Sequence, residues 1–121
     1  MTVRKVLCVD DSAAELDLIR KIVLSANLNV VSATNGKDAI HCAQTELPDL
    51  IFLDIVMSGM DGFDVMRELQ KDPATKDIPV VFVSSKNQKA DQAWAKMQGA
   101  KGFVPKPISE EAILEAIRKF E

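Results

Sequence analysis

The sequence predicts an α/β fold in which helices cover both faces of a five-stranded parallel sheet. Short apolar, β-branched runs alternate along the chain with longer segments in which apolar residues recur at helical spacing. The central runs are apolar at consecutive positions, which is typical of strands buried on both faces. Because crossovers between parallel strands are right-handed, a doubly wound sheet with five helices is the main solution for 121 residues.

The predicted strands are five apolar runs, at residues 6–9, 30–33, 50–53, 80–83 and 103–104. The fifth strand is expected to be short and to lie at an edge of the sheet, because Pro105 lacks the N–H group that a central strand donates. Helical periodicity is clearest in the first and last helical segments. The apolar residues that show it are Leu16, Ile19, Val23 and Ala26, then Ile113, Ala116, Ile117 and Phe120.

Residues that favour helix N-termini support these boundaries. Asn35 and Gly36 mark the expected start of the second helix. Asp61 and Ser109 are expected to cap the third and last helices, because short polar side chains accept hydrogen bonds from the first free N–H groups of a helix. Asp61 is therefore interpreted as a cap and not as a metal ligand. In the helix before the fifth strand, Trp94 shares a face with Met97 and is expected to pack in the core.

Length and composition predict one soluble domain over residues 1–121. Hydrophobic residues make up 47% of the chain and charged residues 27%, as in globular proteins. No apolar run approaches the roughly 20 residues of a membrane span or forms a signal-peptide core, so we expect a cytoplasmic protein without membrane insertion. A formal charge of −3 argues against direct DNA binding. Cys8 and Cys42 lack metal or redox spacing and are expected to be free thiols.

Polar residues follow four of the predicted strands at the point where each strand ends. They are Asp10 and Asp11, then Asp54, then Ser84 and Ser85, and finally Lys106. In open α/β sheets, ligands bind outside the carboxyl ends of the strands. The sequence therefore predicts one site at this edge of the sheet.

The residue types at this edge indicate phosphoryl chemistry. Three carboxylates in one crevice repel one another and require a cation, and an all-oxygen site suits Mg²⁺. Once the cation neutralises the cluster, one carboxylate can act as the nucleophile on phosphorus. A lysine ammonium and a serine hydroxyl can hold the phosphoryl oxygens. An Asp-Asp pair alone is more often a turn or a cap, so the prediction depends on the complete order Asp-Asp, Asp, Ser, Lys-Pro.

Four sequence blocks, VLCVDDS, LIFLDIVMSGMDG, VVFVSS and GAKGFVPKP, carry a family resemblance. In their order and spacing the chain, from Lys5 to Phe120, resembles the CheY-like receiver domains of two-component response regulators. The resemblance implies a flavodoxin-like sheet of strand order 2-1-3-4-5. It also implies a regulatory phosphoprotein and not an enzyme. Such a protein catalyses only its own phosphorylation and its own slow dephosphorylation, and a sensor histidine kinase is the phosphoryl donor.

The resemblance also implies the roles of the metal and acceptor residues. Asp54 is expected to accept the phosphoryl group. The Mg²⁺ ion is expected to be bound directly by Asp11, through water by Asp10, and by the carbonyl oxygen of Val56, and Asp54 belongs to the same metal site. Lys106 is expected to contact the phosphoryl group and to precede a cis peptide bond to Pro107.

Further residues match positions that control the switch and its lifetime. By resemblance, Ser84 contacts the phosphoryl group, and Phe103 is the aromatic residue that turns inward when Ser84 moves. Val56 and Lys86 match positions that tune hydrolysis. We expect slow to moderate loss of the phosphoryl group, because a valine side chain cannot hydrogen-bond an attacking water molecule.

Because the sequence ends at Glu121, output is expected from the surface of the receiver itself. The surface of the fourth helix, fifth strand and fifth helix is the expected place, because lysines gather there and Phe103 lies there. The target is an unidentified protein, and the receiver is expected to be a monomer or a weak phosphorylation-dependent dimer. The motifs DIVM, KNQKADQAW and QGA look most like single-domain regulators of type IV pilus twitching motility, and chemotaxis-type regulators share much of this pattern.

Two positions depart from the family pattern. Ser58 stands where the family usually has proline, and Phe103 lacks the hydroxyl group of the commoner tyrosine. A receiver that forms part of a longer DNA-binding regulator is the main alternative. A phosphohydrolase of the haloacid dehalogenase type would need a D-x-D element after the first strand. A flavodoxin-like electron carrier would need a phosphate loop rich in glycine and hydroxyl groups at the same place. The sequence Asp10, Asp11, Ser12 fits neither alternative.

Overall fold

The sheet has five parallel strands in the part of the chain that the computed structural model describes, residues 2–86 and 88–121. They pair in the order β2-β1-β3-β4-β5, which confirms the strand order that the family resemblance implied. Asn87, within the KNQKADQAW motif, lies outside the described residues. The strands are β1 (Lys5–Val9), β2 (Asn29–Ala33), β3 (Leu50–Leu53), β4 (Val80–Ser84) and β5 (Gly102–Pro105).

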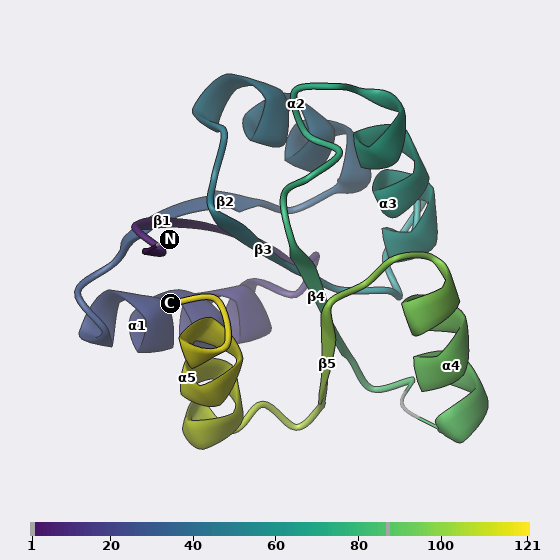
Figure 1. Cartoon of the computed structure of the whole chain (residues 1–121). Coiled ribbons are helices and arrows are strands. Elements are labelled where there is room, and N and C mark those ends of the chain that lie inside the picture. The colour runs from purple at the N-terminus through teal and green to yellow at the C-terminus, as the bar shows by residue number, and fades with distance from the viewer. Residues whose placement is uncertain (1, 87) are drawn as a thin grey trace.

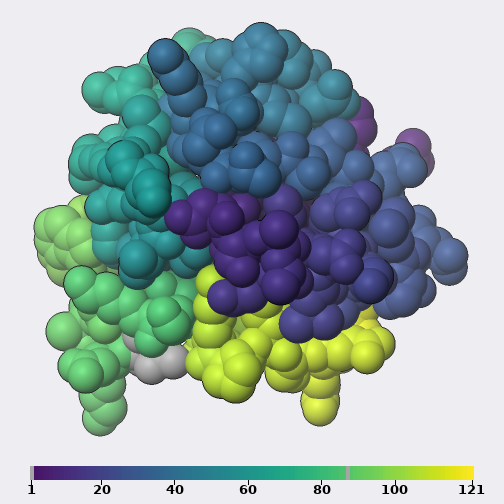
Figure 2. Space-filling model, turned by 180° about the vertical axis from the view of Figure 1, so that it is seen from behind, coloured from purple at the N-terminus to yellow at the C-terminus, as the bar shows by residue number. Residues whose placement is uncertain are grey.

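Helices cover both faces of the sheet (Figure 1). Helices α1 and α5 pack on one face, and α2, α3 and α4 pack on the other. Figure 2, which shows the molecule from behind, places the purple early part of the chain against the yellow C-terminal part, in keeping with the contact between α1 and α5. The helices are α1 (Ala13–Ser25), α2 (Gly36–Glu46), α3 (Gly62–Lys71), α4 (Lys89–Met97) and α5 (Glu110–Arg118).

The side chains of Asp61 and Ser109 cap α3 and α5, as predicted, and that of Asn35 caps α2 at the expected helix start. Each accepts a hydrogen bond from the backbone N–H group three residues later. Asp64 also returns a hydrogen bond to the N–H group of Asp61, so α3 begins with a complete capping box.

Successive strand residues enter two separate apolar cores. In β1, Val6 and Cys8 face α1 and α5, whereas Leu7 and Val9 face the other three helices. All four residues of β3 are fully buried. The consecutive apolar runs of the sequence therefore reflect strands whose two faces both lose contact with water, and each fully buried aliphatic side chain contributes about 1.5–3 kcal/mol to folding.

The fifth strand lies at the edge of the sheet, which confirms the prediction made from Pro105. Pro105 is its last residue and pairs with Ser84 at the end of β4. The next residue, Lys106, donates its backbone N–H to the Ser84 carbonyl oxygen at 3.0 Å. This hydrogen bond holds the start of the loop after β5 against β4. None of the helices in the described residues has the length and apolar character of a membrane span.

The prediction that Trp94 packs in the core is wrong. Its side chain is 47% exposed and that of Met97 is 75% exposed. Helix α4 packs on the sheet through the small residue Ala95, which is its buried residue, so the neighbouring Trp94 lies on a flank of the helix. Trp94 still makes an edge contact with Phe63 of α3, with ring centroids 6.3 Å apart.

The two cysteines are free thiols, as predicted, and they are expected to differ in reactivity. Burial raises the pKa of Cys8 to about 12, and the nearby Arg20 charge offsets only part of this effect. Cys42 is only partly buried, although burial and the Glu46 carboxylate raise its pKa as well. Because the thiolate is the reactive form, iodoacetamide should modify Cys42 alone in the native protein and both cysteines in denaturant. Intact-protein mass spectrometry checks this, and equal native labelling of both residues would contradict it.

Candidate functional site

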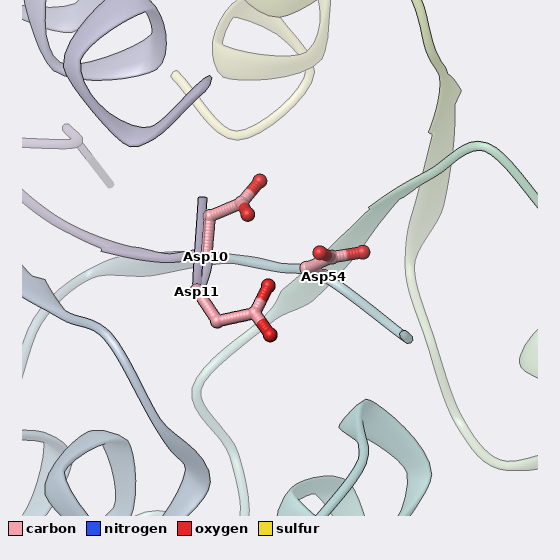
Figure 3. Close-up of side chains that lie close together, drawn as sticks. All are labelled: Asp10, Asp11 and Asp54. Carbon is pink, nitrogen blue, oxygen red and sulfur yellow. The ribbon is translucent and has the colours of Figure 1, made fainter. Parts of the chain in front are cut away.

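Three aspartates meet at the carboxyl edge of the sheet. Asp10 and Asp11 follow β1, and Asp54 follows β3. The backbone N–H of Asp54 donates to the Val9 carbonyl oxygen at the end of β1, at 3.1 Å. One oxygen from each carboxylate lies within 4.8 Å of the others, and Figure 3 shows the three side chains gathered at this edge. The predicted convergence of these residues is therefore present.

Two of these carboxylates are buried and oriented by backbone N–H groups. Asp10 is fully buried and Asp54 is 4% exposed. The Ser12 N–H donates to Asp10 Oδ1 at 2.9 Å, and the Val56 N–H donates to Asp54 Oδ1 at 3.3 Å. Each carboxylate has its other oxygen directed to the ammonium group of Lys106.

Asp11 is exposed, and its carboxylate is tied to the loop that follows Asp54. The Ser58 N–H donates to Asp11 Oδ2 at 3.2 Å. A proline at this position has no N–H group. The departure from the family pattern at Ser58 therefore adds a hydrogen bond between the β3-α3 loop and the acidic cluster.

Lys106 is the cation of the cluster. Its Nζ atom lies 3.0 Å from Asp10 Oδ2, 3.3 Å from Asp54 Oδ2 and 2.6 Å from Glu15 Oε2, and its side chain is only 11% exposed. The peptide bond from Lys106 to Pro107 is cis, as the family resemblance implied. Burial alone would lower the pKa of Lys106, but the hydrogen bonds that its ammonium group donates to Glu15 and Asp10, and the negative charge of Asp54, outweigh burial and raise the pKa above its ordinary value.

The Asp54 carboxylate is in a less favourable environment. Burial, and then the charge of Asp10, raise its pKa to about 6, while the Lys106 ammonium offsets part of this increase. Four acidic side chains, those of Asp10, Asp11, Asp54 and Glu15, gather around one lysine, which pairs with all of them except Asp11. The cluster thus has excess negative charge, and its donors are oxygen atoms, so it fits a hard divalent cation.

The predicted switch and tuning residues lie around this cluster, and one of them, Val56, is hydrogen-bonded to Asp54 through its backbone N–H. Ser84 is fully buried at the end of β4, and its hydroxyl accepts a hydrogen bond from the Lys86 N–H at 3.0 Å. Val56, 55% exposed, and Lys86 line one groove next to the Asp54 loop. Phe103 is partly buried in β5 and packs toward the core on the α4 side.

Glu15 is the site residue that the sequence reasoning missed. It lies in the first turn of α1, where the order Ser12-x-x-Glu15 is typical of a capping box. The available signal was its position one helical turn after Asp11, on the helix that begins at the carboxyl end of β1.

Comparison with known proteins identifies the family. Residues 6–118 match the model of the response regulator receiver domain. The chain is 40% identical to the protein PilH of Pseudomonas aeruginosa, across 93% of each protein. It is 31% identical to PilG of the same bacterium, across 94% of this chain and 84% of PilG.

Solved structures agree with this match. The structure of the Vibrio cholerae chemotaxis protein CheY4 has a TM-score of 0.92 to this chain and 26% sequence identity, and the match covers 99% of this chain and 100% of CheY4. The predicted CheY-like, flavodoxin-like fold and the family resemblance are confirmed. The chain belongs to the response regulator receiver family and is a signalling protein that works through phosphorylation.

Proposed function

We propose that Asp54 accepts a phosphoryl group from a sensor histidine kinase in a reaction that requires Mg²⁺. The observation that carries this proposal is the position of Asp54: it is nearly buried, lies within a cluster of three carboxylates, and has an ammonium group 3.3 Å away. An oxygen of the Asp54 carboxylate attacks phosphorus, an O–P bond forms, and the bond from phosphorus to the donor breaks, with its electron pair leaving on the donor.

The neighbouring side chains support the transfer by charge and hydrogen bonding. Asp10, Asp11 and Asp54, with the Val56 carbonyl oxygen, would hold Mg²⁺, which when bound neutralises negative charge on the transferring group. Lys106 and the Ser84 hydroxyl bind the phosphoryl oxygens. The protein is thus proposed to catalyse only its own phosphorylation and a slow dephosphorylation, for which Val56 and Lys86 set the rate at the groove they share.

The switch is proposed to run from Ser84 to Phe103. Ser84 ends β4, its backbone carbonyl oxygen accepts from Lys106, and β4 pairs with β5 through Phe82 and Phe103. A shift of the Ser84 hydroxyl toward the phosphoryl group therefore acts on the strand that carries Phe103.

Residues 1–121 are proposed to form one cytoplasmic receiver domain that acts in motility or chemotaxis-type control. This domain is proposed to be a monomer, or a weak dimer when phosphorylated.

The output surface is proposed to be formed by α4, β5 and α5. A groove of about 330 Å³ between α4 and β5 is bordered by Phe103, Lys96 and Lys101. These two lysines and Lys89 are exposed. An acidic surface on the downstream protein fits this combination of cations beside a partly buried aromatic ring.

Charge reversal at Lys89, Lys96 and Lys101 is expected to weaken binding of the downstream protein strongly. The partner is first identified by a pull-down that compares phosphorylated and unphosphorylated receiver, and the affinity of the triple glutamate variant is then measured by calorimetry. The matched control reverses Lys21, Lys37 and Lys76, which are exposed elsewhere on the molecule. Equal affinity of the two triple variants would remove the support for this surface.

Labelling by a small phosphodonor tests the proposed reaction. Acetyl phosphate with Mg²⁺ should add one phosphoryl group per chain, visible by intact-protein mass spectrometry. Labelling that proceeds equally well in excess chelator would contradict the metal requirement.

A further inference from the structure

The direction of the Glu15 side chain is not explained by helix capping. In a capping box, the N3 carboxylate accepts a hydrogen bond from the backbone N–H of the N-cap residue, as Asp64 does for Asp61 in α3. In α1, the N–H of the N-cap residue Ser12 instead donates to Asp10. The Ser12 N–H that a capping box would give to the Glu15 carboxylate is thus already bound by Asp10, a residue of the acidic cluster.

The Glu15 carboxylate instead contacts Lys106, in the loop after β5. Its Oε2 atom lies 2.6 Å from Lys106 Nζ, the shortest of the three ion pairs that this lysine makes. This contact joins the early and late parts of the chain that lie side by side in Figure 2. An ammonium group has three N–H donors, and the carboxylates of Asp10, Glu15 and Asp54 provide one acceptor for each of them.

A phosphoryl oxygen that binds Lys106 must therefore replace one of these three acceptors. Asp10 is fully buried and its other oxygen is held by the Ser12 N–H. Asp54 itself carries the incoming group. Glu15 is 40% exposed at its side chain and can turn into water, so it is the acceptor that costs least to displace.

We propose that Glu15 is a positioning residue that holds the Lys106 ammonium in the resting site and competes with the phosphoryl group for it. This inference rests on the proposed phosphorylation of Asp54. It assigns Glu15 the task of setting how tightly the site binds a phosphoryl group, since each phosphorylation event breaks the Glu15–Lys106 ion pair.

Beryllium trifluoride, which mimics a phosphoryl group on a carboxylate, is the probe. Its affinity is measured by fluorine NMR at saturating Mg²⁺ for wild type, Glu15→Gln and Glu15→Asp. Glu15→Gln should bind the probe about two- to fivefold more tightly, the factor expected for loss of a partly exposed ion pair. Glu15→Asp keeps the charge but shortens the reach, so it should also bind more tightly. Unchanged or weaker binding in both variants overturns the proposal.

Two further variants separate the contact from general charge effects. Asp17→Asn removes one negative charge from the same helix, at a residue that pairs with Arg20 and Lys21, and should leave affinity for the probe unchanged. In a Lys106→Ala background, Glu15→Gln should lose its effect. A gain in affinity that persists without Lys106, or that Asp17→Asn reproduces, shows repulsion through space and overturns the proposed competition.

Failure of the proposed function gives a different result. If wild-type protein does not bind beryllium trifluoride in the presence of Mg²⁺, the assignment of Asp54 as acceptor fails. If wild type binds it and neither Glu15 variant differs from wild type, the assignment of Asp54 stands and that of Glu15 fails.

Discussion

Asp54→Asn is expected to abolish phosphorylation by acetyl phosphate. An amide nitrogen or oxygen at this position cannot serve as the anionic nucleophile, while the side chain keeps its size and can still accept the hydrogen bond from the Val56 N–H. The fold should therefore persist, with circular dichroism and urea unfolding close to wild type. Intact-protein mass spectrometry should show no added phosphoryl group under conditions that label wild type fully.

The matched control for this substitution is Asp61→Asn. Asp61 lies in the loop that follows Asp54, and its Oδ1 atom caps α3, a role that asparagine fills as well. Labelling of Asp61→Asn should equal that of wild type. Wild-type labelling of Asp54→Asn would exclude Asp54 as the acceptor, and loss of labelling in Asp61→Asn would make Asp61 part of the site.

Gly62→Ala is expected to lower the stability of the fold strongly, and more than the same substitution at Gly36. Gly62 is the first residue of α3, and its N–H donates to the Ile55 carbonyl oxygen at 2.8 Å. A Cβ atom there would overlap the Asp54 carbonyl oxygen and lie 2.8 Å from Ile55 Cα. Backbone atoms cannot rotate away, so we expect a decrease of about 2–3 kcal/mol in the free energy of unfolding, measured by urea denaturation.

Gly36→Ala provides the comparison. Gly36 is likewise the first residue of a helix that begins after a capping side chain, Asn35. An added Cβ atom at Gly36 would meet the side chain of Met60, at 2.8 Å from its sulfur atom. Because a side chain can change rotamer whereas the Asp54 backbone cannot, Gly36→Ala should be clearly less destabilising. Equal losses in the two variants would show that the close approach to Asp54 is not the cause.

The strands and the location of the site were predictable from sequence for a simple physical reason. Strands buried on both faces leave uninterrupted apolar runs such as that of β3, and the first polar residues after β1 and β3 mark where those strands reach the ligand-binding edge. The order of the strands was not contained in these patterns, because pairing between distant runs leaves no local signal. It came from the resemblance to receiver domains.

The contacts of individual side chains were not predictable. The Ser12-x-x-Glu15 spacing favours a capping box, and the competing hydrogen bond from Ser12 to Asp10 depends on a turn geometry that the sequence does not display. The Ser58 contact uses a backbone N–H, which no side-chain pattern reveals. For Trp94, helical periodicity shows which residues share a face, but it does not show that α4 packs through Ala95.

The exposed position of Trp94 makes the protein a natural fluorescent sensor. The chain has one tryptophan and no tyrosine, so its emission in the near ultraviolet comes almost entirely from one indole ring. That ring has one edge against Phe63 of α3 and much of its surface in water. A displacement of α4 relative to α3 would change both the polarity around the indole and its collisions with acrylamide, so a change in the emission wavelength and in the quenching constant would show that these two helices have moved relative to each other.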